Sequence, residues 1–382
     1  MSHMKHVTRF LATLLFSLQV QATPLANPQQ SALHTLGELV FFDTSLSKTG
    51  NQSCATCHDP ATAFVDSRSN RSTAAVSLGD DNASLGARNT PSISYAALTP
   101  EFAIDREGYL GGLFLDGRAK TLSSQALEPF VNPLEMALPS HEALVAKIIA
   151  RPVYKTLLET IDSRNATSSK HVLSTVANAL AAFQRGPVFS TFDAKYDRFL
   201  AGEAELNALE ERGRSLFFSQ LANCSQCHML NTATVKANET FTNYRYHNIG
   251  VPANDVVNRL ASHKDSLPDM GLYNNPAVKT EDARGKFKVP SLRNVAVTAP
   301  YMHNGVFQKL ETAVHFYNQF IVTNPDTKTN PETGKPWQAP EVDINISIDI
   351  LKQGQPMDKQ RIAAIVAFLK TLTDKRYEAL LE

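Results

Sequence analysis

Two copies of one short motif constrain this chain more than any other feature. "SCATCHDP" runs from Ser53 to Pro60, and "NCSQCHML" runs from Asn223 to Leu230. Each copy places two cysteines three positions apart with a histidine directly after the second, and together they use all four cysteines of the chain. Any account of this sequence must therefore explain two copies of a thiol pair that is followed by an imidazole.

The motifs belong to a longer internal repeat. In "LGELVFFDTSLSKTGNQSCATCH" Gly37 precedes the pair Phe41–Phe42, and in "RGRSLFFSQLANCSQCH" Gly213 precedes the pair Phe217–Phe218 at the same spacing. Each copy predicts a helix with a paired aromatic face, then a turn, then a short helix that carries the cysteines. The repeat therefore indicates two related structural units.

Length and charge agree with two units. The 382 residues exceed one typical domain. We predict domains at residues 23–190 and 191–382, joined near residues 186–202 by "GPVFSTFDAKYDRFLAG". Basic and acidic side chains balance at 37 each. The sequence contains no stripe of basic residues of the kind that binds nucleic acid, so we expect no nucleic-acid partner.

Helical periodicity dominates the rest of the chain. Apolar residues recur at i, i+3, i+4 and i+7 in "HEALVAKIIA", "HVLSTVANALAAFQR" and "DKQRIAAIVAFLKTL". Helices are predicted at residues 141–150, 171–185, 203–218 and 358–372. Long loops rich in Pro, Gly and Asn lie at residues 70–89, 236–286 and 323–344. Loops of this length are unusual unless they wrap something.

The first residues resemble an export signal. From Met4, "MKHVTRFLATLLFSLQVQA" has a basic start, an apolar run and small residues before the expected cut after Ala22. Residues 1–22 are therefore predicted to be a signal peptide. The apolar run is too short to span a bilayer, and no later stretch is longer, so we expect a periplasmic mature protein without a transmembrane segment.

Three interpretations compete for the cysteine motifs. A disulfide within each pair is possible but leaves the following histidine without a role. A four-cysteine zinc site must join two pairs that are far apart in the sequence, and it also leaves both histidines idle. Covalent attachment of haem uses every residue, because the thiols bond the porphyrin and the histidine binds the iron. We favour two haem c groups, held by Cys54, Cys57, His58, Cys224, Cys227 and His228.

The fold class expected from these features is mainly α, with two cytochrome c-like haem domains, long loops and little sheet. The sixth ligand of each iron then decides the chemistry. An open position reacts with peroxide or oxygen, whereas a filled position passes electrons.

A series of ordered motifs resembles the bacterial di-haem cytochrome c peroxidases and their MauG relatives. These motifs are "ELVFFDTSLS", "RNTPS", "FLDGRAKTLSSQALEPFVNPLEM", "VPSLRNVAVTAPYMHNGVF" and "LETAVHFYN". The resemblance extends from about residue 33 to residue 372. It implies that the N-terminal haem reacts with peroxide and that the C-terminal haem transfers electrons.

The resemblance also implies roles for two side chains at the peroxide-reactive haem. The family's distal glutamine and glutamate match Gln125 and Glu135. A carboxylate with a raised pKa can move a proton between the two peroxide oxygens, and an amide can orient the bound peroxide. In the peroxidases a distal histidine blocks this haem until reduction. Between His58 and Arg88 the chain has no histidine, so we expect an open haem that needs no reductive activation.

At the C-terminal haem the resemblance places the sixth ligand at Tyr317. Peroxidases carry methionine there, whereas MauG carries tyrosine. A phenolate is a hard anionic donor, so this haem is expected to have a low potential. Met302 is interpreted as a packing residue, and His303 as a residue that does not bind iron directly.

Two further features follow from the resemblance. The tryptophan that lies between the haems in the family is replaced by Leu115, so haem coupling is expected to be weaker or to use Phe114, Tyr109 or direct tunnelling. The chain's single tryptophan, Trp337, is interpreted as a loop-packing residue. The relatives also hold calcium between the haems with an amide and carbonyl oxygens. The matching residues are Asn89, Thr298 and Pro300.

Three functions fit this sequence. The first is a MauG-like enzyme that uses hydrogen peroxide to oxidise Trp or Tyr side chains of a partner protein through high-valent haem iron. The second is a cytochrome c peroxidase that takes electrons from a small cytochrome c or cupredoxin. The third is a di-haem electron carrier with both irons six-coordinate. The missing distal histidine and Tyr317 favour the first.

Overall fold

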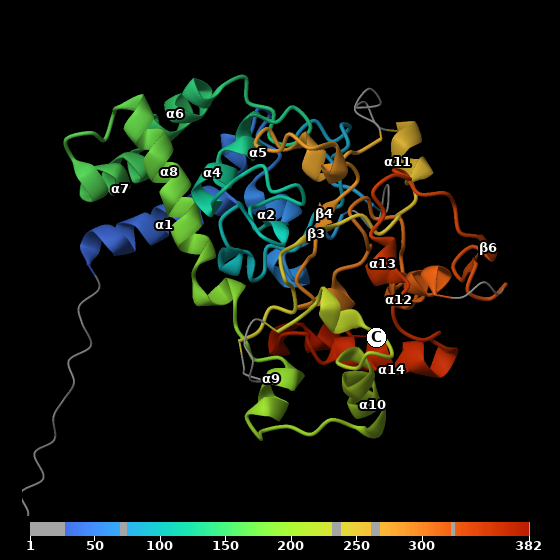
Figure 1. Ribbon diagram of the computed structural model, residues 1–382. Coiled ribbons are helices and arrows are strands. Elements are labelled where there is room, and N and C mark those ends of the chain that lie inside the picture. The colour runs from blue at the N-terminus through green and yellow to red at the C-terminus, as the bar shows by residue number, and fades with distance from the viewer. Residues whose placement is uncertain (1–26, 69–74, 231–237, 261–267, 322–324, 382) are drawn as a thin grey trace, which may run out of the picture.

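The protein is described by a computed structural model that covers residues 27–68, 75–230, 238–260, 268–321 and 325–381. The expected signal peptide, residues 1–22, lies outside this range. The chain is mainly helical with little sheet, which confirms the predicted fold class (Figure 1). None of the helices in the described ranges is long and apolar enough to cross a membrane.

The helices of the first half are α1 (Pro28–Phe42), α2 (Cys54–Cys57), α4 (Leu122–Ala126), α5 (Glu128–Val131), α6 (His141–Ile149), α7 (Pro152–Asp162) and α8 (Ser169–Gln184). Those of the second half are α9 (Lys195–Leu200), α10 (Ala208–Phe217), α11 (Asp255–Leu260), α12 (Leu310–Phe316), α13 (Ile348–Leu351) and α14 (Lys359–Lys370). The strands pair antiparallel as β1 (Ala103–Asp105) with β2 (Gly108–Leu110), β3 (Tyr246–His247) with β4 (Phe287–Lys288), and β5 (Thr329–Asn330) with β6 (Lys335–Pro336).

Short 3₁₀ helices complete the chain. They are η1 (Thr44–Leu46), η2 (Pro60–Thr62), η3 (Ala96–Leu98), η4 (Pro187–Phe189), η5 (Cys224–Gln226), η7 (Leu272–Asn274), η8 (Glu281–Ala283), η9 (Val295–Val297), η10 (Tyr317–Phe320) and η11 (Lys375–Leu380).

The two copies of the sequence repeat form two similar pairs of crossing helices. Helix α1 packs on α8 in the first half and α10 packs on α14 in the second, as the ribbon shows (Figure 1). A Cβ atom on Gly37 would lie 2.0 Å from the carbonyl oxygen of Ala179, and one on Gly213 would lie 1.8 Å from that of Ala364. Both glycines therefore allow the same close backbone contact, which a side chain would prevent.

Buried apolar side chains form two large clusters. One draws on residues 36–189 and the other on residues 196–372. The predicted boundary between residues 190 and 191 falls between these clusters. The two halves are also joined near the C-terminal end, where the Tyr377 hydroxyl donates a hydrogen bond to the backbone carbonyl of Pro60 at 2.8 Å.

The periodic segments at residues 141–150, 171–185 and 358–372 form α6, α8 and α14, within two residues of their predicted bounds. The segment predicted at 203–218 is helical only from Ala208. Asn207 caps the start of this helix, because its side-chain oxygen accepts hydrogen bonds from the backbone N–H groups of Leu209 and Glu210. The second cysteine motif forms the 3₁₀ helix η5 rather than an α-helix.

Candidate functional site

The two cysteine motifs line two different cavities. A cavity of about 470 Å³ is lined by Cys54, Cys57 and His58, and one of about 370 Å³ by the motif at residues 224–228. Both volumes lie in the range of roughly 300–1,000 Å³ typical of cofactor pockets. Because the two cysteine pairs face separate cavities, the four-cysteine zinc interpretation is wrong. All four cysteines are free, so neither pair forms a disulfide.

The motif histidines are oriented alike. The Nδ1 atom of His58 lies 3.1 Å from the carbonyl oxygen of Phe64, and the Nδ1 atom of His228 lies 3.0 Å from that of Phe241. A carbonyl only accepts, so each Nδ1 carries the proton and each Nε2 keeps a lone pair. This is the usual arrangement of a metal-binding histidine, whose second ring nitrogen donates to a carbonyl or carboxylate.

Burial keeps both imidazoles neutral. It lowers the pKa of His58, and it lowers the pKa of His228 to about 4. A neutral imidazole is the form that binds a metal. At neutral pH both rings therefore have the neutral form, with a free lone pair on Nε2, that can bind a metal ion.

The accepting carbonyls are presented by an uncommon backbone conformation. Phe64 and Phe241 have φ angles of 59° and 55°, in the left-handed region that bulky residues rarely adopt. Their side chains are almost completely buried, which holds the backbone in place. Sequence reasoning missed both residues, because Phe64 follows its histidine by six positions and Phe241 follows by thirteen. The equivalence of the two phenylalanines is visible only in the fold.

Gln125 and Glu135 line the first cavity together with His58. Gln125 lies on α4, and Glu135 lies in the turn after α5. Asn132 donates a hydrogen bond from Nδ2 to Oε1 of Glu135 at 2.8 Å. Burial raises the pKa of the Glu135 carboxyl, and this effect outweighs the opposing charge of Arg118 and the hydrogen bond from Asn132. Glu135 therefore holds a proton at a higher pH than an ordinary glutamate does.

The loop that carries the distal histidine in the peroxidases contributes Ser77, Gly86 and Ala87 to this cavity. None of these side chains is a good iron ligand. Residues 69–74 of the same loop lie outside the described part of the chain, and their sequence "SNRSTA" contains no histidine.

Tyr317 lines the second cavity together with both cysteines of the second motif. It lies at the start of η10, directly after α12. Burial raises the pKa of its phenol, so the side chain is neutral until a cation binds beside it. Helices α4 and α12 follow equivalent turns, closed by the bridges Leu113↔Ala119 and Tyr301↔Phe307. Gln125, within α4, and Tyr317, directly after α12, thus both follow such a turn.

Met302 and His303 also line the second cavity. Met302 packs against the second hydrophobic cluster, as expected for a packing residue. The His303 ring stacks on Phe287 at 3.8 Å between centroids, and its Nε2 lies 3.4 Å from Oε2 of Glu341. These contacts tie His303 to neighbouring protein groups.

Leu115 lines both cavities, so it occupies the wall that they share. Phe114 lines the first cavity and packs under the Arg118 guanidinium, 3.5 Å from its carbon to the ring centroid. Tyr109 stacks on Phe102 in the β1–β2 hairpin region, with 5.8 Å between ring centroids.

Trp337 packs against Phe307 and Phe316, with ring centroids 5.5 and 5.2 Å away. Its indole N–H donates to the carbonyl of Thr327 at 2.9 Å. These contacts fit the packing role expected for it.

The three residues matched to a calcium site line one cavity. Asn89, Thr298 and Pro300 all line the second cavity, and Asn89 also lines the first. The backbone N–H of Asn89 donates to the carbonyl of His303 at 2.8 Å, which joins two distant segments. No group of three acidic, histidine or cysteine side chains suited to a metal occurs in the described ranges. Asn89, Thr298 and Pro300 themselves offer only amide, hydroxyl and carbonyl oxygens to a hard cation.

Comparison with known proteins identifies the family. Residues 31–205 match the family described as di-haem cytochrome c peroxidase. The methylamine utilization protein MauG of Paracoccus denitrificans is 48% identical, over 94% of this chain and 92% of its own. The cytochrome c551 peroxidase of Nitrosomonas europaea is 27% identical, over 93% of this chain and 84% of its own.

A solved structure has the same fold. The di-haem peroxidase BthA of Burkholderia thailandensis superposes with a TM-score of 0.79 at 31% identity, covering 92% of this chain and 88% of that one. Because the relatives are enzymes, the hypothesis of a non-enzymatic electron carrier is wrong. The chain belongs to the di-haem cytochrome c peroxidase family and is a MauG-like oxidoreductase with two haem cofactors.

Proposed function

We propose that this protein uses hydrogen peroxide to oxidise Trp or Tyr side chains of a partner protein. The observation that carries the proposal is the phenol of Tyr317 in the cavity of the second motif, where the peroxidases carry methionine. The 48% identity with a MauG protein supports the same choice.

The two haems would be covalently attached, through Cys54 and Cys57 in the first cavity and Cys224 and Cys227 in the second. His58 and His228 would bind the irons from one side through Nε2. When bound, the haems supply peroxide cleavage and storage of oxidising equivalents.

In the first cavity the protein's task is to move a proton. Glu135, with its raised pKa, would take a proton from the inner peroxide oxygen and return it to the outer one, which leaves as water. The Gln125 amide would orient the peroxide beside it. No histidine competes for this position in residues 59–87.

In the second cavity the phenolic oxygen of Tyr317 would fill the remaining iron position. A hard anionic donor favours the oxidised metal, so this site suits storage of an oxidising equivalent. Oxidation of a large partner then needs no direct access to the cavity, because electrons leave the partner side chain over a distance.

Two further assignments accompany this function. Asn89, Thr298 and Pro300 would hold calcium between the haems with an amide oxygen and backbone carbonyls. Residues 1–22 would direct export to the periplasm, where the enzyme would encounter its partner protein or a small electron-donor protein.

A second candidate function is peroxide reduction with electrons from a small cytochrome c or cupredoxin. The relationship to a cytochrome c551 peroxidase favours it. The two functions differ in electron source, so one experiment separates them.

That experiment supplies the purified holoprotein with peroxide and either reduced cytochrome c or candidate partner proteins. We expect slow turnover with cytochrome c and new covalent oxidation of Trp or Tyr in a partner, seen by mass spectrometry. Rapid peroxide consumption with cytochrome c, together with unmodified partners, would support peroxide reduction instead. Electron paramagnetic resonance of the ferric protein is expected to show one high-spin and one low-spin haem.

A further inference from the structure

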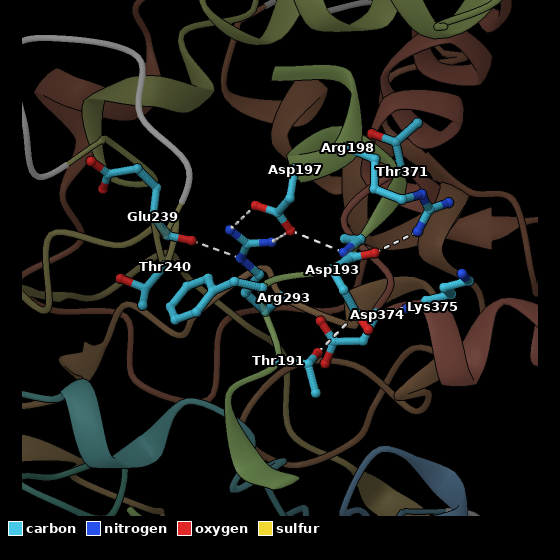
Figure 2. Close-up of polar contacts among 12 residues, drawn as sticks. Thr191, Asp193, Asp197, Arg198, Glu239, Thr240, Arg293, Thr371, Asp374 and Lys375 are labelled. Atoms are coloured by element: carbon cyan, nitrogen blue, oxygen red, sulfur yellow. Dashed lines mark hydrogen bonds and ion pairs between the residues drawn. The ribbon is translucent and has the colours of Figure 1, made fainter. Parts of the chain in front are cut away.

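A buried arginine lies between the two halves of the molecule. Only 3% of Arg293 is exposed, and Nη1 and Nη2 donate to the two carboxylate oxygens of Asp197 at 2.5 and 2.8 Å. Its Nε donates to the backbone carbonyl of Glu239 at 2.7 Å. Figure 2 shows the guanidinium between these two partners. A bidentate pair of this kind fixes both the position and the plane of the guanidinium.

The segment that Arg293 holds is the one that orients His228. Phe241 lies two residues after Glu239, and the guanidinium carbon lies 5.4 Å from the centroid of the Phe241 ring. Ser291 fixes the residue between them, because its Oγ donates to the carbonyl of Thr240 at 2.7 Å. The carbonyl of Phe241 then accepts the Nδ1 proton of His228. A turn with an uncommon backbone angle is therefore anchored at three consecutive residues.

The same guanidinium also contacts the first half of the chain. Its carbon lies 5.4 Å from the centroid of the Tyr95 ring. The backbone N–H of Tyr95 donates to the carbonyl of Phe189 at 2.8 Å. Phe189 stacks on Phe64 with 4.5 Å between ring centroids, and the carbonyl of Phe64 accepts from His58. Both motif histidines are thus connected to one arginine through a few buried contacts.

We propose that Arg293 is a positioning residue for both histidines. It acts on His228 through its hydrogen bond to Glu239, which anchors the segment whose Phe241 carbonyl holds that histidine. It acts more weakly, through Tyr95, on the segment whose Phe64 carbonyl holds His58. The hydrogen bond at Nδ1 raises the basicity of a ligating imidazole and so tunes the metal's potential. This role goes beyond the proposed function, since it applies to either electron source.

The test compares holoprotein variants by redox titration and by electron paramagnetic resonance of the ferric haems. Arg293→Met with Asp197→Asn removes the pair without changing the net charge. We expect the potential of the C-terminal haem to rise and its low-spin signal to shift, because a less firmly held His228 is a weaker donor. The N-terminal haem is expected to shift less, in the same direction.

Arg198→Met is the matched control. Arg198 lies in the same interface (Figure 2), where it donates to the Asp193 carbonyl and to Glu378, and it makes no contact with residues 239–242 among its described bonds. It is expected to leave both potentials at the wild-type value. Arg293→Lys keeps the charge and one hydrogen bond. Its haem potentials are therefore expected to lie between those of the double variant and those of the wild type.

Ser291→Ala is a milder second variant that loosens Thr240 and keeps the buried ion pair. It is expected to shift only the C-terminal haem. If the double variant fails to mature, Arg293→Lys decides the matter. Potentials and spectra of the double variant that match those of Arg198→Met would overturn the proposal, and so would wild-type values in Arg293→Lys.

Discussion

The buried environment of Glu135 supports its proposed role as a proton carrier. Burial raises its pKa, although a hydrogen bond from Asn132 and the charge of Arg118 oppose the shift. The basic form is therefore lost as pH falls through a value above the roughly 4.3 of an unperturbed glutamate. Peroxide reactivity that depends on this carboxylate must fall with it.

We predict that Glu135→Gln lowers the rate of reaction with peroxide by about 10²–10⁴-fold, the usual contribution of a general base. The variant should also lose the acidic decline of the wild-type pH profile. Stopped-flow absorbance from acid to neutral pH measures both effects. Glu142→Gln, at the exposed start of α6, is the control. A wild-type pH profile in Glu135→Gln would exclude this carboxyl as the proton carrier.

Tyr317 is the second decisive residue. Replacement by methionine exchanges a hard anionic donor for a soft neutral one. Tyr317→Met is expected to raise the potential of the C-terminal haem and to abolish oxidation of partner side chains, while the high-spin signal of the N-terminal haem stays. Redox titration and mass spectrometry of the partner are the measurements. An unchanged low-spin signal would show that another group fills this iron position.

At the scale of elements, the two helix crossings depend on glycine. A Cβ on Gly213 would lie 1.8 Å from the Ala364 carbonyl oxygen, far inside contact distance, so α10 and α14 would have to separate. Gly213→Ala is expected to destabilise the second half by about 1–3 kcal/mol, as overpacking usually does. Thermal unfolding monitored at the haem absorption band measures it. Ser215→Ala, on the exposed face of α10, should leave the free energy of unfolding within about half a kcal/mol of the wild-type value.

Elements whose signal is local could be predicted from the sequence. Helices α6, α8 and α14 follow from apolar periodicity, and the histidines proposed as ligands follow from contiguous motifs. Contacts between distant segments could not be predicted. Arg293 and Asp197 are 96 positions apart, and nothing near either residue marks it as buried. The carbonyls of Phe64 and Phe241 were missed for the same reason, since their role depends on a backbone turn and on packing.

At the scale of the whole molecule, the wall between the two cavities is expected to control the rate of electron transfer between the haems. Leu115 lines both cavities, and its carbonyl accepts the backbone N–H of Lys288 at 2.9 Å. An aliphatic side chain is a poor carrier for electrons compared with an indole. The enzyme is therefore expected to share electrons between its haems more slowly than a relative with tryptophan there.

We predict that Leu115→Trp speeds electron equilibration between the haems, at a cost in stability of about 1–3 kcal/mol for the larger side chain. Stopped-flow mixing of the ferric protein with less than one equivalent of reductant follows the equilibration. Leu115→Phe is the matched control, because its ring fills space but is harder to oxidise. Equal rates in all three proteins would mean that electrons cross elsewhere.

The hydrogen bond from Tyr377 to Pro60 sets an order of assembly. The two residues are 317 positions apart, so the turn that follows the first cysteine motif is finished by a residue made much later. A chain that emerges from its N-terminus therefore presents the first pair of thiols before this contact can form. Under the proposed covalent attachment of haem, an attaching enzyme would reach these thiols while their surroundings are still open.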